Sequence, residues 1–162
     1  MYIIFLVGLL VGMDQISKYL VTSHLYGKEP LTIIPNFLEF YYLENKGAAF
    51  GILQEKRTLF IIITIIVVLF IVYLLYHYEH NNPFLYTSLI FILAGTIGNF
   101  IDRVRLHYVV DFIKVKIFGY NFAIFNVADS FIVVGTIILI IYILLAEEKG
   151  KINREPKENN HR

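Results

Sequence analysis

The 162-residue chain has no cysteine, no tryptophan and few charged residues, which make up only 17% of it. Without cysteine, disulfides, thiolate metal sites and a cysteine nucleophile are excluded. The formal net charge of +1 gives no reason to expect a nucleic-acid partner. Hydrophobic residues account for 57% of the chain, which is too apolar for an ordinary soluble domain. The length suffices for about four membrane spans of roughly 20 residues each.

Four long apolar runs predict that the chain crosses a membrane four times and is therefore a mainly α membrane protein. The expected spans are residues 2–21, 58–77, 84–102 and 126–146. The first run lacks the basic region and the small-residue cleavage motif of a signal peptide, so we interpret it as a retained span. Residues 1–146 are expected to form one membrane domain, and the charged residues 147–162 a disordered tail.

Residues 23–57 are polar enough to leave the membrane. Within them, Leu31–Leu43 is rich in β-branched and aromatic side chains, and Pro35 and Asn36 divide it into two short strands. Four spans place this region on the same side of the membrane as residues 102–125. These two loops carry eight Lys and Arg residues, against five in the tail on the other side. The positive-inside rule therefore does not support placing the loops outside the cell.

Three of the four aspartates of the chain lie in the stretch from Gly95 to Ser130, around the expected membrane boundary. A carboxylate is costly to desolvate there, so each one requires a specific reason. Three other polar residues accompany them in the sequence. The whole group indicates a polar site and consists of Asn99, Asp102, Arg103, Asp111, Asn126 and Asp129.

The segment between two of these aspartates is predicted to be a short hairpin. Lys114–Phe118 and Asn121–Phe125 partly alternate apolar with polar residues on either side of a turn that contains Tyr120. Asp111 and Asp129 each lie nine residues from Tyr120. Because a hairpin returns the chain to its starting point, we expect the two carboxylates to come close together.

Small and polar residues recur on one face of the third span. Gly95, Gly98 and Asn99 follow a three- and four-residue spacing, which allows a neighbouring helix to pack closely. Asp102 and Arg103 follow one turn later, where the span reaches the interface. A helix-end cap with a snorkelling arginine explains these two residues as well as substrate contact does.

Two other polar pairs also have structural explanations. Asn126, followed three residues later by Asp129, resembles a helix N-cap with an acidic residue at the third helical position. Capping and catalysis do not exclude each other. Asp14 and Lys18 are four residues apart in the first span, so they share a helix face and can pair inside the membrane. Packing of the helix bundle is the favoured role of this pair, and a direct chemical role is the alternative.

Two loop features remain. Residues 44–51 contain two glycines and two alanines within five positions, which allows close backbone approach. Asn45 at their start belongs either to a tight turn or to a binding site. His77 and His80 lie in the link between the second and the third span with no third ligand nearby, so no metal site is expected.

Five short motifs occur in a fixed order around these spans. They are Asp14-Gln15-x-x-Lys18, Asn45-x-Gly47-Ala48-Ala49-Phe50, Gly98-Asn99-x-x-Asp102-Arg103, Val109-Val110-Asp111-Phe112 and Phe125-Asn126-x-Ala128-Asp129-Ser130. With these motifs the chain closely resembles the prolipoprotein signal peptidases, the signal peptidase II family of membrane aspartic endopeptidases. The resemblance extends from Asp14 to Ser130. One departure is that His107 and Tyr108 stand where the family commonly has a glycine.

The resemblance implies an enzyme that removes signal peptides from lipoprotein precursors, cutting just before a cysteine that carries diacylglycerol. The catalytic pair then corresponds to Asp111 and Asp129. Asp14 and Lys18 match supporting positions. Positions that line the family's site and contact substrate or the inhibitor globomycin correspond to Asn45, Gly47, Asn99, Asp102, Arg103 and Asn126.

The resemblance also implies a location and partners. It predicts a multi-pass protein of the cytoplasmic membrane with both termini cytoplasmic, a small β-sheet on the outer surface, and an active site near the extracytoplasmic face. We adopt this orientation against the charge count. The expected partners are diacylglyceryl-prolipoproteins and membrane lipids, and the expected state is a monomer without a metal or other cofactor.

Two neighbouring carboxylates can hydrolyse a peptide without a metal, because one stays charged and activates water while the other holds a proton for the substrate. A Ser–Lys protease is the nearest enzymatic rival, with Ser17 or Ser130 and Lys18, but Ser17 and Lys18 point to different helix faces. A small proton-coupled transporter subunit and a scaffold subunit are the non-enzymatic alternatives.

Overall fold

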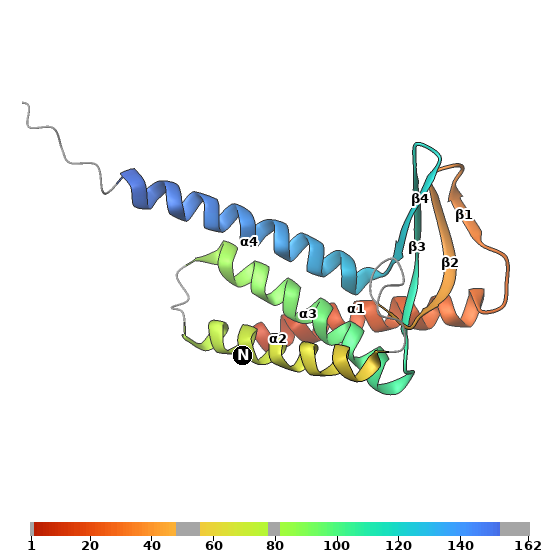
Figure 1. Cartoon of the computed structure of the whole chain (residues 1–162), viewed down its shortest axis with the longest axis horizontal. Helices are drawn as coiled ribbons and strands as arrows, with labels where there is room; N and C mark the ends of the chain where they lie inside the picture. Colours follow the sequence, from red (N-terminus) through yellow and green to blue (C-terminus); the bar gives the residue numbers. More distant parts are fainter. Residues whose placement is uncertain (1, 48–55, 78–81, 153–162) are drawn as a thin grey trace, which may run out of the picture.

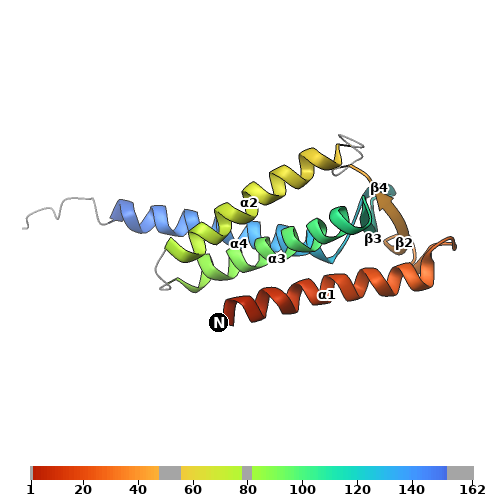
Figure 2. The same ribbon diagram turned by 90° about the horizontal axis from the view of Figure 1, so that it is seen from below.

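The computed structural model describes residues 2–47, 56–77 and 82–152. Along these residues the elements are α1 (Tyr2–Leu25), β1 (Leu31–Ile34), β2 (Leu38–Asn45), α2 (Arg57–His77), α3 (Pro83–Arg105), β3 (Val109–Ile117), β4 (Tyr120–Phe125) and α4 (Val127–Ile152). The helices run roughly along the long axis of the molecule, and the strands form a sheet across one end of the bundle (Figures 1 and 2). All four helices are long and apolar enough to cross a membrane, which confirms the predicted fold class.

The helices extend beyond several of the predicted spans. α1 continues to Leu25 and α3 to Arg105, so both run past the apolar part of their sequences. α4 continues to Ile152, into the segment predicted to be a disordered tail. Adding a residue to an existing helix costs little, so a span continues into polar sequence until a breaker stops it. Residues 153–162 lie outside the described part of the chain.

α3 is the central helix of the bundle. Half of the residues in its membrane-spanning part are buried, against 11% in each of the other three helices. Its small residues allow this close packing, as predicted: a Cβ added to Gly98 would lie 2.6 Å from Asp14 Oδ2 and 3.2 Å from the Ala128 side chain. α1 and α4 can therefore approach α3 closely at the level of the polar residues.

The strands form one antiparallel sheet in the order β1-β2-β3-β4. The two strands predicted between the first and the second span are present, and the turn between them contains Asn36 at φ 59°. β2 pairs with β3, with Asn45 opposite Val109 and Leu38 opposite Val115. The predicted outer sheet and the predicted hairpin are thus parts of a single sheet.

The predicted hairpin is present, but its turn lies before the predicted position. Phe118 and Gly119 form the turn with φ values of 50° and 81°, and Tyr120 already belongs to β4, opposite Ile117. A register shift between Lys114 and Lys116 then places an extra residue in β4. This extra residue compensates in part for the displaced turn, so the ends of the hairpin still meet.

Gly98→Ala tests the close approach of α3 to α1 and α4. We expect overpacking to lower the free energy of unfolding by about 1–3 kcal/mol, even though alanine is the better helix former. Denaturation in mixed micelles measures the change. The matched control is Gly8→Ala in α1, where an added Cβ has no atom within 4 Å. Equal stability of the two variants would contradict the packing.

Candidate active site

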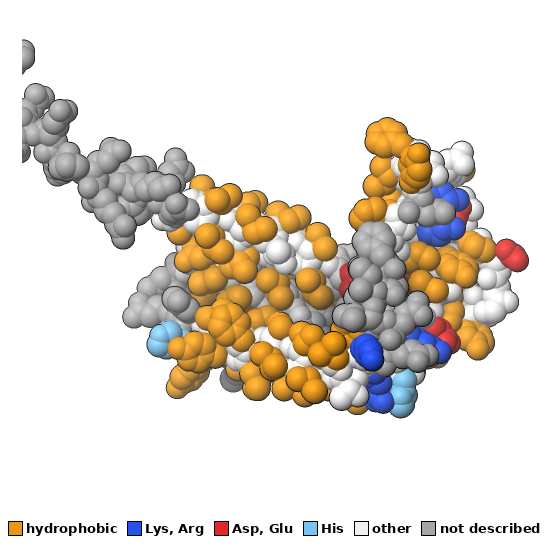
Figure 3. All heavy atoms as spheres, viewed as in Figure 1, with side chains coloured by type: hydrophobic (Ala, Val, Ile, Leu, Met, Phe, Trp, Pro, Cys, Tyr) orange, Lys and Arg blue, Asp and Glu red, His pale blue; other side chains and the backbone are white. Residues whose placement is uncertain are grey.

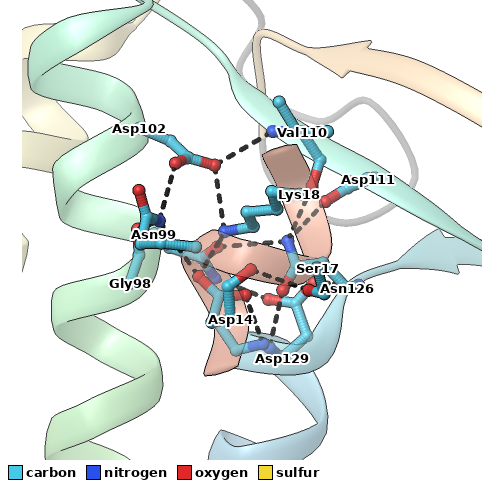
Figure 4. Close-up of polar contacts among 12 residues, drawn as sticks. Asp14, Ser17, Lys18, Gly98, Asn99, Asp102, Val110, Asp111, Asn126 and Asp129 are labelled. Carbon is cyan, nitrogen blue, oxygen red and sulfur yellow. Dashed lines mark hydrogen bonds and ion pairs between the residues drawn. The ribbon is translucent and has the colours of Figure 1, made fainter. Parts of the chain in front are cut away.

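A buried ammonium group, that of Lys18, lies where the helix bundle meets the sheet. Lys18 Nζ is 2.9 Å from Asp14 Oδ2, 2.9 Å from Asp102 Oδ2 and 3.0 Å from Asn99 Oδ1 (Figure 4). These contacts use all three of its hydrogen-bond donors. The predicted pairing of Asp14 with Lys18 is therefore confirmed, and the pair is connected to α3 through two further side chains.

The two carboxylates bound to Lys18 also hold two backbone amides. Asp14 Oδ1 accepts a hydrogen bond from Ala128 N at 2.9 Å, and Asp102 Oδ2 accepts one from Val110 N at 3.1 Å. Ala128 directly precedes Asp129, and Val110 directly precedes Asp111. The ion cluster therefore fixes the backbone next to both candidate catalytic residues.

Gln15 connects the same two carboxylates from the neighbouring position on α1. Its Nε2 donates to Asp102 Oδ1 at 3.0 Å, to Asp14 Oδ2 at 3.1 Å and to the Gly98 carbonyl oxygen at 3.2 Å. In the sequence, Gln15 is recognisable only as part of the first motif, without a predicted role. Its position beside Asp14 was the available signal.

Asn126 caps α4 as predicted. Its Oδ1 accepts from Asp129 N at 2.8 Å, while Asp129 Oδ2 accepts from Asn126 N at 3.2 Å, which is a reciprocal capping box. The Nδ2 of Asn126 donates to Asp111 Oδ1 at 2.7 Å. The cap therefore links the two candidate catalytic aspartates through one fully buried amide.

Each of the two aspartates has a further amide partner. Asn45 Nδ2 donates to Asp111 Oδ2 at 2.7 Å, and Asn99 Nδ2 donates to Asp129 Oδ1 at 2.7 Å. Asp111 is only 1% exposed. Burial, assisted by the negative charge of Asp129, raises the pKa of Asp111 to about 7 even though the amides of Asn45 and Asn126 oppose the shift.

A cavity of about 550 Å³ opens beside these carboxylates. Its polar lining consists of Asn45, Gly47, Asn99, Arg103, Asp111, Asp129 and Ser130, and its apolar walls come from β4 and the first turns of α4. Asp102 and Asn126, expected among the residues that contact substrate, are absent from this lining. They lie behind it, where they bind Val110 N and Asp111 respectively.

Arg103 faces the cavity and is held from α2. Its guanidinium carbon lies 4.9 Å from the centre of the Phe60 ring, a cation–π contact. Arg57 donates from Nε to the Arg103 carbonyl oxygen at 2.7 Å and from Nη2 to the Val104 carbonyl oxygen at 3.1 Å. Arg57 thereby satisfies carbonyl groups in the last turn of α3 and holds the end of the helix that carries Arg103.

The other candidate residues are engaged elsewhere. Ser17 Oγ donates to the Asp14 carbonyl oxygen at 2.7 Å, and Ser130 Oγ donates to the Asn126 carbonyl oxygen at 3.0 Å. His77 stacks on Tyr73. Within residues 2–47, 56–77 and 82–152, no three His, Cys, Asp or Glu side chains cluster as metal ligands would. His80 and residues 48–50 of the second motif lie outside the described residues.

The fold and the site together define an integral membrane protein of four spans in which two carboxylates face one cavity at the end of the bundle. Residues 6–145 match the signal peptidase (SPase) II family. The chain belongs to this family of membrane proteases.

Relatives and solved structures agree with this assignment. Lipoprotein signal peptidases from two serotypes of Streptococcus pyogenes are 43% identical over 142 residues, which cover 88% of this chain and 92% of each relative. One solved bacterial membrane enzyme is 39% identical with a TM-score of 0.83, covering 97% of this chain and 93% of its own. A second is 41% identical with a TM-score of 0.80, covering 88% and 92%.

Lys18→Met tests whether the buried ammonium holds the site together. The change leaves two buried carboxylates without their cation, so we expect the free energy of unfolding to fall by about 3–5 kcal/mol. Lys114→Met is the matched control, because Lys114 also pairs with a carboxylate, that of Glu39, but at a more exposed position. Denaturation of both variants in mixed micelles should show a large loss for the first and little change for the second. Similar losses would contradict the central role of Lys18.

Proposed function

We propose that this protein removes signal peptides from diacylglyceryl-modified prolipoproteins, cleaving just before the lipidated cysteine, with Asp111 and Asp129 as its catalytic pair. One observation carries the proposal: both carboxylates line the same cavity and bind the same residue, Asn126. Membership of the signal peptidase II family supports the reaction, and the names of the Streptococcus relatives support the lipoprotein substrate.

The two carboxylates act with one proton between them. Asp111 holds this proton, in keeping with its raised pKa. Asp129 is the charged partner, because it lies in the first turn of α4, where the helix dipole favours a negative charge. Asn99 connects this carboxylate to the buried ammonium, since its oxygen accepts from Lys18 and its nitrogen donates to Asp129.

Hydrolysis then proceeds through a neutral tetrahedral intermediate. Asp129 accepts a proton from water as the water oxygen bonds to the scissile carbonyl carbon, and Asp111 gives its proton to the carbonyl oxygen. In the second step the carbon–nitrogen bond breaks. Asp129 returns its proton to the leaving nitrogen, and Asp111 takes one from a hydroxyl of the intermediate. The pair is then back in its starting state.

The cavity provides separate places for the parts of the substrate. Its apolar walls, which include Phe125 of β4 and Ile132 and Val133 of α4, suit the side chains of a signal peptide or the acyl chains of the lipid. Arg103 is placed to hold a backbone carbonyl or a lipid head group. Asn45 and Gly47 line the cavity as well, and Asn45 donates to Asp111.

Asp102 and Asn126 serve the reaction from behind the cavity. The resemblance implied substrate contact for both residues. Their hydrogen bonds instead favour a positioning role, since Asp102 holds the amide of Val110 and Asn126 donates to Asp111. Asp14 and Lys18 extend the same support from α1.

The protein acts in the cytoplasmic membrane with both termini on the cytoplasmic side and the cavity near the outer face. The arrangement of the chain is consistent with this orientation, because α1 begins and α4 ends at the end of the bundle opposite the sheet (Figure 1). We propose a monomer as the working unit, since one chain supplies both carboxylates.

Asp111→Asn and Asp129→Asn, made one at a time, test the catalytic pair. Each change keeps the side-chain shape but removes a carboxylate, so we expect cleavage of a diacylated precursor peptide to fall by roughly a thousand-fold or more. Glu29→Gln, the same chemical change at an exposed loop position, is the matched control and should cleave normally. Full processing by either aspartate variant would refute the assignment. Altered proton flux without any effect on processing would instead favour the transporter.

The pH dependence of cleavage tests the shared proton. The raised pKa of Asp111 keeps this acid neutral up to about pH 7. Above that pH the proton is lost and both carboxylates are charged, so the rate should fall about tenfold per pH unit. The rate should also fall at acid pH, where both carboxylates are neutral. Initial rates in buffered micelles measure the profile, and a flat profile from about pH 4 to about pH 9 would contradict the mechanism.

A further inference from the structure

Two turns of the sheet lie side by side at the end farthest from the catalytic pair. One joins β1 to β2 and the other joins β3 to β4. They are adjacent because Leu38 at the start of β2 pairs with Val115 near the end of β3. Lys116 N also donates to the Phe37 carbonyl oxygen across the two turns at 2.8 Å.

These turns carry exposed apolar side chains. Phe118 is 98% exposed and Tyr120 is 81% exposed, and three further residues are exposed by nearly half. We call the five residues the tip patch; it consists of Ile34, Phe37, Ile117, Phe118 and Tyr120. Neither turn contains a charged residue between its strands. Turns that face water are usually polar, so the composition of these two indicates an apolar neighbour.

Toward the tip patch, the two faces of the sheet differ in polarity. Along β3 the side chains alternate, so Ile113, Val115 and Ile117 share the face of Asp111. The opposite face carries Lys114 and Lys116, which both pair with Glu39 of β2. The apolar face is therefore the face turned toward the cavity, and the charged face is the opposite one.

The position of the tip relative to the helices identifies the neighbour. The sheet crosses the end of the bundle, and the β3–β4 hairpin extends sideways beyond α4 (Figure 1), with hydrophobic side chains gathered at its tip (Figure 3). β4 leads directly into α4, whose outward side chains, among them Ile137 and Ile140, are half-exposed and meet lipid in a membrane. The lipid-facing surface of α4 therefore leads through β4 to the tip patch.

We propose that the tip patch inserts into the boundary between head groups and acyl chains of the membrane leaflet on the sheet side. Aromatic side chains favour this boundary, and an amphipathic element lies in it with its apolar side toward the lipid. Because β4 also forms a wall of the cavity, the inserted tip fixes the position of that wall relative to the membrane. This anchor does not depend on the proposed reaction.

The absence of tryptophan from the chain makes a direct test possible. Phe118→Trp introduces a single fluorescent reporter at a side chain that packs against almost nothing. The variant is reconstituted into phosphatidylcholine vesicles with bromine near the carbonyl end or near the methyl end of the acyl chains. We expect blue-shifted emission that is quenched, most strongly by bromine near the carbonyl end.

Two matched reporters calibrate the result, and circular dichroism verifies that each variant is folded. Ile137→Trp, near the middle of α4, should be quenched most by bromine near the methyl end. Glu29→Trp, in the loop between α1 and β1, should stay unquenched. Phe118→Trp emission that matches the Glu29→Trp variant would overturn the proposal. Blue-shifted but unquenched emission would also overturn it, because protein would then cover the tip patch. Strongest quenching by bromine near the methyl end, as expected for the Ile137→Trp variant, would overturn it too, because the tip patch would then lie deeper than the head-group boundary.

Discussion

The structure depends on the ion cluster in which Lys18 lies between Asp14 and Asp102. A single buried ammonium or carboxylate would be too costly at this depth, and only mutual pairing with full hydrogen bonding makes the three tolerable. Lys18 is 2.9 Å from each carboxylate, and each carboxylate also accepts a hydrogen bond from a backbone amide of another element. The cluster thus joins α1, α3, the start of β3 and the start of α4.

This arrangement explains how a site assembled from distant parts of the chain stays rigid at a membrane surface. The sheet brings Asp111, the capping box of α4 brings Asp129, and the cluster fixes the backbone immediately before each of them. The apolar surroundings strengthen these interactions, because they lower the local dielectric constant. The same surroundings keep water away from the supporting residues and leave the two aspartates facing the cavity.

Features that depend on local pattern were predicted well. The four spans follow from length and apolarity, the pairing of Asp14 with Lys18 follows from helical spacing, and the cap at Asn126 follows from its distance to Asp129. Features that depend on register were predicted less well. The hairpin turn was predicted to contain Tyr120, whereas Phe118 and Gly119 form it, and a one-residue bulge in β4 offsets part of the difference. Composition does not show such a bulge, because register depends on the pairing between strands.

The sequence by itself determined that the chain is a four-span membrane protein and where its spans and motifs lie, because apolar length and residue spacing act over short distances along the chain. Only the tertiary structure decided which polar side chains face the cavity and which bind one another behind it. It turned Asp102 away from the cavity toward Lys18, merged two predicted β regions into one sheet, and assigned the amides of Val110 and Ala128 to carboxylates on other helices. Such contacts join residues far apart in the chain, and they form only when close helix packing brings them within hydrogen-bonding distance.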